Sequence, residues 1–164
     1  IIGSWAVQYI QPLFVPAKTT DTNAVSYSAR GTKYGDVVRT SDRAITTDRS
    51  KNTGGKGQGV TSTGLYMSAL AVSCSQAVRE AAKGMQLDDV RVEVNHNGDG
   101  TFTRLITLYG DLSAEEVETL RAAGAASTVD GYVQKGEIET TVETATLERR
   151  RRQNKLHRAE RLGK

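Results

Sequence analysis

The chain has 164 residues, a formal net charge of +3 and 25% charged residues, which fits one globular domain with room for extensions. Its single cysteine excludes a fold held by internal disulfides, and no apolar run reaches the roughly 18 residues that a membrane-spanning helix needs. No metal or cofactor motif has the required spacing, so we expect no metal, no cofactor and no membrane span.

The charge is unevenly distributed along the chain. Residues 145–164 hold eight basic and two acidic residues, whereas the other 144 residues hold 14 basic and 17 acidic ones. We therefore expect three parts: an extended N-terminal arm at 1–23, a mildly acidic folded domain at 24–144, and a basic helical tail at 145–164.

The folded domain begins with short runs of alternating apolar and polar residues. Such runs at 25–29, 36–41 and 44–47 predict three strands of an antiparallel meander. The polar stretch at 46–59 that follows ends in GGKGQG, which suggests a phosphate-binding loop. The spacing does not match, because Val60 stands where the P-loop lysine belongs. We expect a flexible connection here.

A long helix at 61–85 organises the rest of the chain. Its apolar residues recur at helical spacing, and residues 65–74 carry no charge, so we expect the first half to be buried on all sides. Gly84 is placed to end the helix. Cys74 lies on the apolar stripe and has two interpretations: a small buried hydrophobic residue, or a nucleophilic thiolate activated by a nearby positive charge.

Two further strands at 90–95 and 102–109 flank an Asn-Gly and Asp-Gly turn, which predicts a hairpin. The turn resembles half a calcium loop, but its twelfth position is Ile106 rather than glutamate. A helix at 112–123 follows, with a Ser113 to Glu116 capping box. We expect Val117 and Leu120 to face inward and Gly124 to end that helix. A short helix or turn at 127–135 and a final strand at 138–142 complete the predicted domain.

The sequence of the tail predicts a basic helix at 146–162. Its basic residues are candidates for nucleic-acid binding, because neutralising several phosphates releases counterions and gives sequence-independent affinity. The alternatives are a solvated tail without a partner and, less favoured, a membrane-surface helix, for which the apolar stripe is thin. The candidate residues are Arg149, Arg150, Arg151, Arg152, Lys155, Arg158, Arg161 and Lys164.

Several segments, in this order, resemble the OsmC/Ohr family of thiol-dependent peroxidases. They are RTSD at 39–42 within the opening strands, LYMSALAVSC at 65–74, MQLDDVRVEV at 85–94, and SAEE, STVD and GEIE at 113–116, 127–130 and 136–139. The resemblance implies an α+β OsmC-like fold, in which an antiparallel sheet packs on a long buried central helix. It also implies a dimer, formed with a second copy or with another OsmC-like chain.

The chemistry of that family depends on a nucleophilic thiolate and on an arginine that lowers the pKa of the thiol. The resemblance places the nucleophile at Cys74 and the arginine at Arg30 or Lys33. The family also uses a glutamate that holds the arginine. That residue maps near Thr63, in a stretch without any carboxylate.

The family's fourth group is a second cysteine that resolves the sulfenic acid as a disulfide. It maps to Ser127, which cannot form a disulfide. Only one of the four groups is clearly kept, so the resemblance indicates a peroxidase site that has degenerated.

Two functions remain open from the sequence. The favoured one is a non-catalytic, structural OsmC-like subunit of a ribonucleoprotein, with the mitochondrial ribosome as the leading example, which contacts RNA phosphates and neighbouring proteins through its extensions. The absence of an initiator methionine is compatible with import, so we expect a mitochondrial rather than a cytoplasmic location. The alternative is a one-cysteine thiol peroxidase that uses Cys74.

Overall fold

The computed structural model describes residues 19–29 and 31–144, which form parts of two compact units. The first unit holds the described residues 19–29, 31–61 and 139–144, and the second is Ser62–Ile138. The basic tail, the helix predicted at 146–162 and most of the N-terminal arm lie outside the described residues. Within the described part, no helix is long and apolar enough to cross a membrane.

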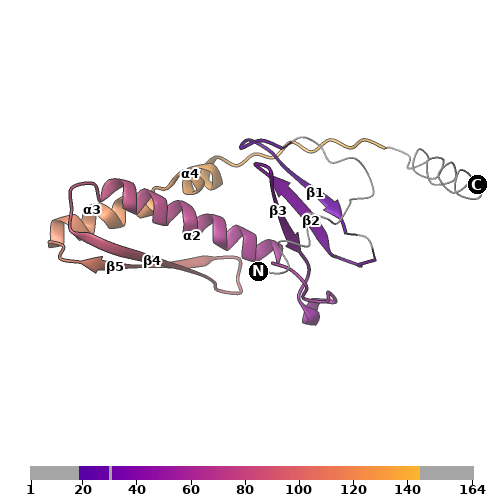
Figure 1. Cartoon of the computed structure of the whole chain (residues 1–164), viewed down its shortest axis with the longest axis horizontal. Coiled ribbons are helices and arrows are strands. Elements are labelled where there is room, and N and C mark those ends of the chain that lie inside the picture. The colour runs from indigo at the N-terminus through magenta and orange to yellow at the C-terminus, as the bar shows by residue number, and fades with distance from the viewer. Residues whose placement is uncertain (1–18, 30, 145–164) are drawn as a thin grey trace, which may run out of the picture. The chain divides into compact units, whose positions relative to one another are not determined.

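The first unit is built on a three-stranded antiparallel meander (Figure 1), as the alternating pattern predicts. Its strands are β1 (Ala24–Ser28), β2 (Asp36–Thr40) and β3 (Arg43–Thr47). Tyr27 of β1 and Val37 of β2 are direct cross-strand neighbours and are 2% and 6% exposed. This pair is the apolar centre of the sheet, since cross-strand pairs are the unit of sheet stabilisation.

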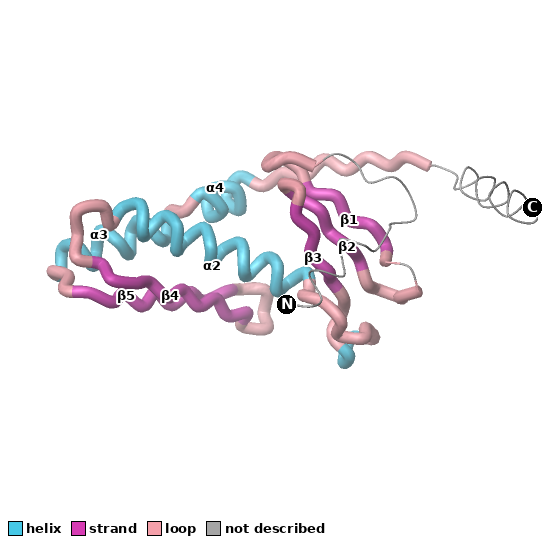
Figure 2. The backbone as a smooth tube through the Cα atoms, in the orientation of Figure 1, coloured by secondary structure: helices cyan, strands magenta, loops and turns pink. Residues whose placement is uncertain are grey.

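The glycine-rich segment after β3, expected to be a flexible connection, forms a loop whose backbone is hydrogen-bonded to the side chain of Asp48. It contains the short 3-10 helix η1 (Lys51–Thr53) and projects from the three-stranded sheet (Figure 2). The carboxylate of Asp48, which is 7% exposed, accepts hydrogen bonds from the backbone N–H groups of Arg49, Lys56 and Gln58, at 2.8, 2.9 and 3.2 Å. A single buried side chain therefore holds both ends of the loop.

The second unit packs one helix against a hairpin and a second helix. Helix α2 (Ser62–Ala81) lies along the hairpin of β4 (Leu87–His96) and β5 (Phe102–Gly110). The chain continues into α3 (Ala114–Ala125), which packs on α2, and α4 (Thr128–Lys135). The fully or almost fully buried residues of this core are Cys74, Val78, Ala82 and Leu120.

The expected bounds of α2 are close to those observed, and its apolar stripe is buried. The chain leaves the helix through Gly84, whose φ of +89° is a conformation that favours glycine. The expectation that the first half is buried on all sides is wrong for this chain: Tyr66 is 39% and Val72 is 54% exposed. The hairpin and α3 bury only part of the helix surface, so an uncharged face is left exposed.

Helix α3 starts as expected, with Ser113 as its N-cap and a capping box to Glu116. Leu120 is fully buried, but Val117 is 42% exposed and does not face inward. Gly124 does not end the helix, which continues to Ala125. It is a packing position: a Cβ there would lie 3.0 Å from the Cys74 sulfur and 2.7 Å from Ile106 Cδ1.

The strand predicted at 138–142 is absent. Residues 136–144 form no helix or strand, and Ile138 and Val142 are 90% and 86% exposed. Alternating apolar residues form a stable strand only where another strand supplies hydrogen bonds and a covering surface, and in the described part of this chain none does so here.

The packing at Gly124 predicts that Gly124→Ala destabilises the protein by about 1–2 kcal/mol. Overpacking a filled core costs about 1–3 kcal/mol, and the better helix propensity of alanine offsets up to about 1 kcal/mol of that cost. The control is Gly131→Ala in α4, where nothing lies within 4 Å of the added carbon. Urea unfolding should show the first variant weakened and the second neutral or strengthened. Equal effects would contradict close packing at residue 124.

The hydrogen bonds to Asp48 predict a pH-dependent contribution to stability. The backbone N–H of Gln58, followed by those of Lys56 and Arg49, holds the pKa of Asp48 below its ordinary value against the opposing effect of burial. This stabilisation is complete at neutral pH and is lost as the pH falls below about 4, through the lowered pKa. Asp48→Asn should therefore destabilise the protein at pH 7, and the difference should shrink towards pH 3. Asp21→Asn, at an exposed turn, is the control and should change little at either pH.

Candidate functional site

Cys74 lies in the middle of α2 with its side chain completely enclosed by the core of the second unit. Its exposed fraction is 0%. Its sulfur would be 3.0 Å from a Cβ at Gly124 of α3, so the backbone of α3 passes directly over the thiol. A peroxide or a second thiol has no access to this sulfur unless α2 and α3 separate.

The electrostatic environment of Cys74 favours the neutral thiol. Burial raises the pKa of Cys74 above its ordinary value, because the charged thiolate loses its hydration. The positive charge of Arg104 acts in the opposite direction, and the negative charge of Asp130 adds to the effect of burial. The net shift is upward, whereas a nucleophilic cysteine needs a lowered pKa.

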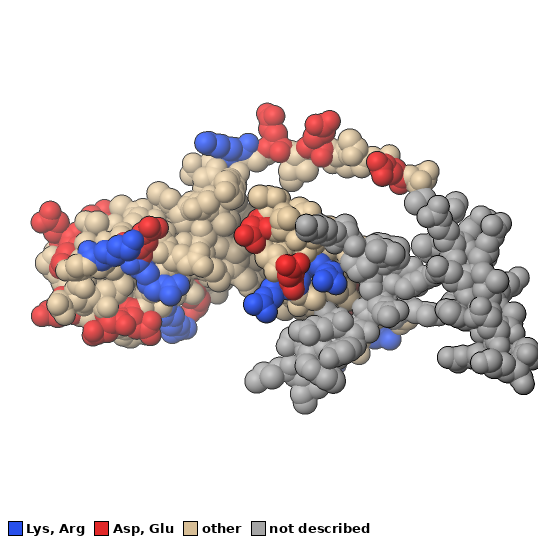
Figure 3. Space-filling view, turned by 45° about the horizontal axis from the view of Figure 1, so that its top comes forward, with Lys and Arg blue, Asp and Glu red and all other residues tan. Residues whose placement is uncertain are grey.

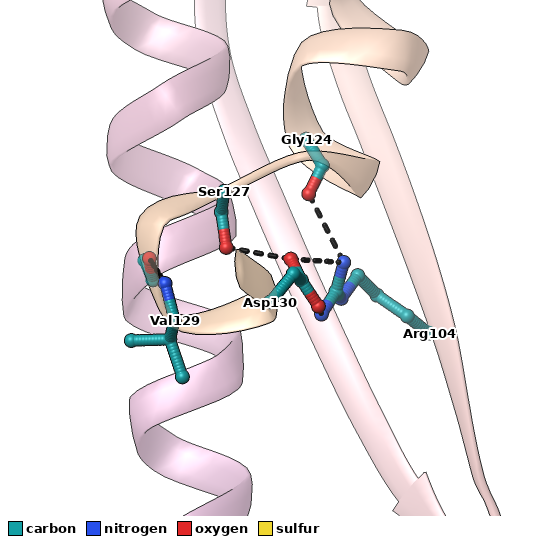
Figure 4. A network of polar contacts seen from close by, with 6 residues as sticks. Arg104, Gly124, Ser127, Val129 and Asp130 are labelled. Carbon is teal, nitrogen blue, oxygen red and sulfur yellow. Dashed lines mark hydrogen bonds and ion pairs between the residues drawn. The ribbon is translucent and has the colours of Figure 1, made fainter. Parts of the chain in front are cut away.

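Arg104 of β5 forms a bidentate ion pair with Asp130 of α4. The two guanidinium nitrogens lie 2.7 and 3.1 Å from the two carboxylate oxygens, and one of them also donates to the backbone carbonyl of Gly124 at 3.0 Å (Figure 4). The side chains are only 19% and 18% exposed. Burial acts to raise the pKa of Asp130, but hydrogen bonds from Arg104 and Ser127 outweigh it and hold that pKa below its ordinary value.

Ser127 is part of the same network. It is 2% exposed, and its hydroxyl donates to Asp130 at 2.6 Å. It also occupies the N-cap position of α4, and the next turn is joined to α2 by a hydrogen bond of 3.1 Å from the backbone N–H of Val129 to the hydroxyl of Ser73 (Figure 4). The serine at 127 thus positions Asp130, and through Asp130 it positions Arg104.

An open groove of about 600 Å³ lies on the exposed side of α2, beside the start of α4. Small and apolar residues of α2 line most of it, and Ser73, Thr128 and Val129 line the part next to α4. Cys74 is not among the lining residues, because it projects from α2 towards the core instead. The groove and the thiol are therefore separate features of the same helix.

The resemblance to the OsmC/Ohr family places the arginine of this site at Arg30 or Lys33. Arg30 lies outside the described residues, and Lys33 lies in the first unit, where its ammonium is 5.0 Å from the ring centre of Tyr34. The arginine whose charge acts on Cys74 is Arg104, and the carboxylate that holds it is Asp130. The basic residues at 149–164 lie outside the described residues, so their role stays a prediction.

Two sequence signals could have indicated the Arg104 and Asp130 pair. Arg104 occupies the inward-facing register of β5, shared with Phe102, Ile106 and Leu108, where an arginine needs a buried partner. Asp130 stands three residues after Ser127, which is the spacing of a capping motif. Among the described residues, no group of three or more His, Cys, Asp or Glu side chains is placed to hold a metal ion.

Comparison with known proteins finds similarity in structure only. No protein-family model matches the sequence, and no curated protein is similar to it. A solved structure of an osmotic-stress-induced and detoxification response protein from Psychrobacter arcticus superimposes with a TM-score of 0.56 at 16% identity, over 72% of this chain and 89% of that one. An OsmC-like protein from Mycoplasma pneumoniae gives 0.55 at 14% identity, over 73% and 89%.

This chain has an OsmC-like fold. The expected fold class is thereby confirmed: α+β, with antiparallel strands packed on a long central helix. At 14–16% identity the similarity establishes the fold and leaves activity to be argued from the site. On the OsmC-like fold of this chain, the central-helix cysteine is enclosed and the serine at 127 is hydrogen-bonded to a carboxylate.

The ion pair beside Cys74 predicts opposite effects of its two members on the thiol. Asp130→Asn should lower the pKa of Cys74, because it removes a negative charge and leaves Arg104 to stabilise the thiolate. Arg104→Gln should raise it further. Titration of the thiolate absorbance in the full chain measures the pKa of Cys74 in each variant. A pKa that moves in the same direction in both variants would show that the pair does not act on Cys74 electrostatically.

Asp130→Asn should also cost about 1–3 kcal/mol of stability, because a mostly buried guanidinium loses a charged partner. The matched control is Glu118→Gln, which breaks the exposed pair with Arg121, where both side chains are more than 60% exposed. That change should cost less than about 1 kcal/mol.

Proposed function

We propose that this chain is a non-catalytic OsmC-like subunit of a ribonucleoprotein assembly, with the mitochondrial ribosome as the leading candidate. The main support for a non-catalytic role is that Cys74 is enclosed in the core. Its sulfur has no exposed surface, its pKa is raised, and the groove on α2 does not reach it. A thiol in this environment packs as a small hydrophobic residue.

The polar residues around the thiol support the same proposal. Ser127 bonds to Asp130, and Asp130 neutralises Arg104. The two terminal guanidinium nitrogens of Arg104 are bonded to Asp130 and to the carbonyl of Gly124, and only its buried Nε has no hydrogen-bond partner among the described residues, so most of its donors are not available to orient a peroxide. The network instead fixes the start of α4 against β5, which is a structural role.

The ribonucleoprotein part of the proposal comes from the sequence. The run of four arginines at 149–152, continued by Lys155, Arg158 and Arg161, suits sequence-independent contact with phosphates. The second unit carries no comparable run: between residues 62 and 138 there are six basic and eleven acidic residues. Neighbouring proteins, including a second OsmC-like chain, are proposed partners of the exposed uncharged face of α2.

The proposal predicts that Cys74 stays reduced when the folded protein is treated with an organic hydroperoxide. Mass spectrometry of Cys74, with turnover of an added thiol followed in parallel, measures the reaction. The rate should be about 100-fold or more below that of the same protein unfolded in urea, because reaction requires a local opening that costs several kcal/mol. Cys74→Ser is the blank for modification elsewhere in the chain.

The alternative function, a one-cysteine peroxidase, predicts the opposite result. Rapid formation of a sulfenic acid at Cys74, reversed by dithiothreitol with turnover, would replace the non-catalytic proposal by the enzymatic one. Arg104 would then be the activating cation, and the ion pair with Asp130 would have to open during the reaction.

A further inference from the structure

The loop after β3 in the first unit carries a cluster of positive charge that forms no ion pair with another described residue. Its three cations are Arg49, Lys51 and Lys56, all exposed, and no carboxylate occurs between Asp48 and Glu80. Lys33, also exposed, joins them through Tyr34: its ammonium lies 5.0 Å and the guanidinium of Arg49 lies 4.2 Å from the centre of the tyrosine ring. We call these four cations and Tyr34 the loop surface.

The cations of the two units differ in whether they form ion pairs. All four ion pairs among the described residues lie in the second unit, where Lys83, Arg91, Arg104 and Arg121 each contact a carboxylate. In Figure 3, acidic and basic side chains lie together at one end of that unit. The described cations of the first unit, including those of the loop surface, form no ion pair with a described residue. Ordinary surface pairing therefore does not account for the loop surface.

The backbone that carries these cations is held by several close contacts. Asp48 binds three of its backbone N–H groups, and the backbone is so closely packed that a Cβ at Gly55 would lie 1.9 Å from the carbonyl oxygen of Arg49. Tyr34 contacts the loop as well, since a Cβ at Gly54 would lie 3.6 Å from its ring edge. A preorganised surface loses less entropy on binding.

The position of Asp48 determines how an anion can be bound here. In a P-loop, backbone N–H groups point at the phosphate. Here the N–H groups of Lys56 and Gln58 point inward to a carboxylate, which would repel a phosphate at the same place. An anion must therefore lie outside the loop, on the side chains, where several phosphates spaced along a chain fit better than one buried group.

We infer that the loop surface contacts the sugar–phosphate backbone of a nucleic acid, which is RNA in the assembly proposed above. This inference rests on that proposed function but assigns the contact to a different part of the chain from the basic tail. Arg49 and Lys33 both contact the ring of Tyr34, which keeps the two cations near each other. The remaining loop side chains are hydroxyls and amides that can bond to sugar and phosphate oxygens. The loop residues 49–59 include no apolar anchor for a lipid bilayer.

The test is the affinity of the full chain for a fluorescent single-stranded RNA of mixed sequence, measured over a range of salt concentrations. Lys51→Gln with Lys56→Gln should reduce the slope of log affinity against log salt by about 1.4, at about 0.7 per lost phosphate contact. The affinity at 0.1 M salt should fall about 25-fold by the same relation. The matched control is Lys83→Gln with Lys135→Gln, which makes the same charge change in the second unit. It should alter the salt dependence and the affinity far less. Circular dichroism and urea unfolding confirm that all variants fold.

A third variant separates this inference from the proposed function. Replacing the four arginines at 149–152 by glutamine tests the tail. If this change abolishes RNA binding while the loop variant binds like wild type, the loop surface is not a contact and the proposed tail contact stands. If only the loop variant loses affinity, the loop inference holds and the role of the tail fails. Equal losses in the loop variant and its control would mean a general charge effect and would overturn the inference.

A lipid surface is the remaining competitor. The same variants are tested for binding to vesicles of phosphatidylserine and phosphatidylcholine. If the loop variant loses vesicle binding while its RNA affinity is unchanged, the inferred partner is wrong.

Discussion

The close contact between α2 and α3, which depends on the absence of a side chain at Gly124, is the constraint on which the second unit depends. It brings the backbone of α3 onto Cys74 and Val78, completes the core with Leu120, and places the carbonyl of Gly124 where Arg104 can donate to it. The same contact removes the thiol from solvent. Packing and the burial of the thiol therefore have one cause, and the thiol could become exposed only if part of the core separated.

The ion pair of Arg104 and Asp130 is the second link between elements. It joins the first part of β5 to the first turn of α4, and Ser127 adds a third group to it. Buried ion pairs contribute little more stability than a well-packed apolar contact. They do specify geometry, because a buried charge that loses its partner strongly destabilises the fold. In this chain the pair sets where α4 begins and supports a wall of the groove on α2.

Much of the fold could be predicted from local sequence. Alternation gave the meander and the hairpin, helical spacing gave α2 with Cys74 on its buried stripe, and the Ser113 to Glu116 spacing gave the start of α3. What could not be predicted depends on contacts distant in sequence. Arg104 and Asp130 are 26 residues apart, and no local pattern pairs them. The prediction of a strand at 138–142 was wrong for the same reason. A strand needs a neighbouring strand to pair with, and local alternation does not show whether one is present. Asp48 was missed because its partners are backbone N–H groups, which are invisible in a sequence.

The uncharged exposed face of α2 has a consequence for the behaviour of the protein in solution. Charged side chains keep protein surfaces apart by mutual repulsion and by their hydration, and the helix offers none from its first turn to Val78. Val72 is 54% exposed on it and lines an open groove. Colloidal stability will therefore depend on whether this face is covered. Self-association of the purified chain should increase with its concentration, and a partner that covers this face should suppress it.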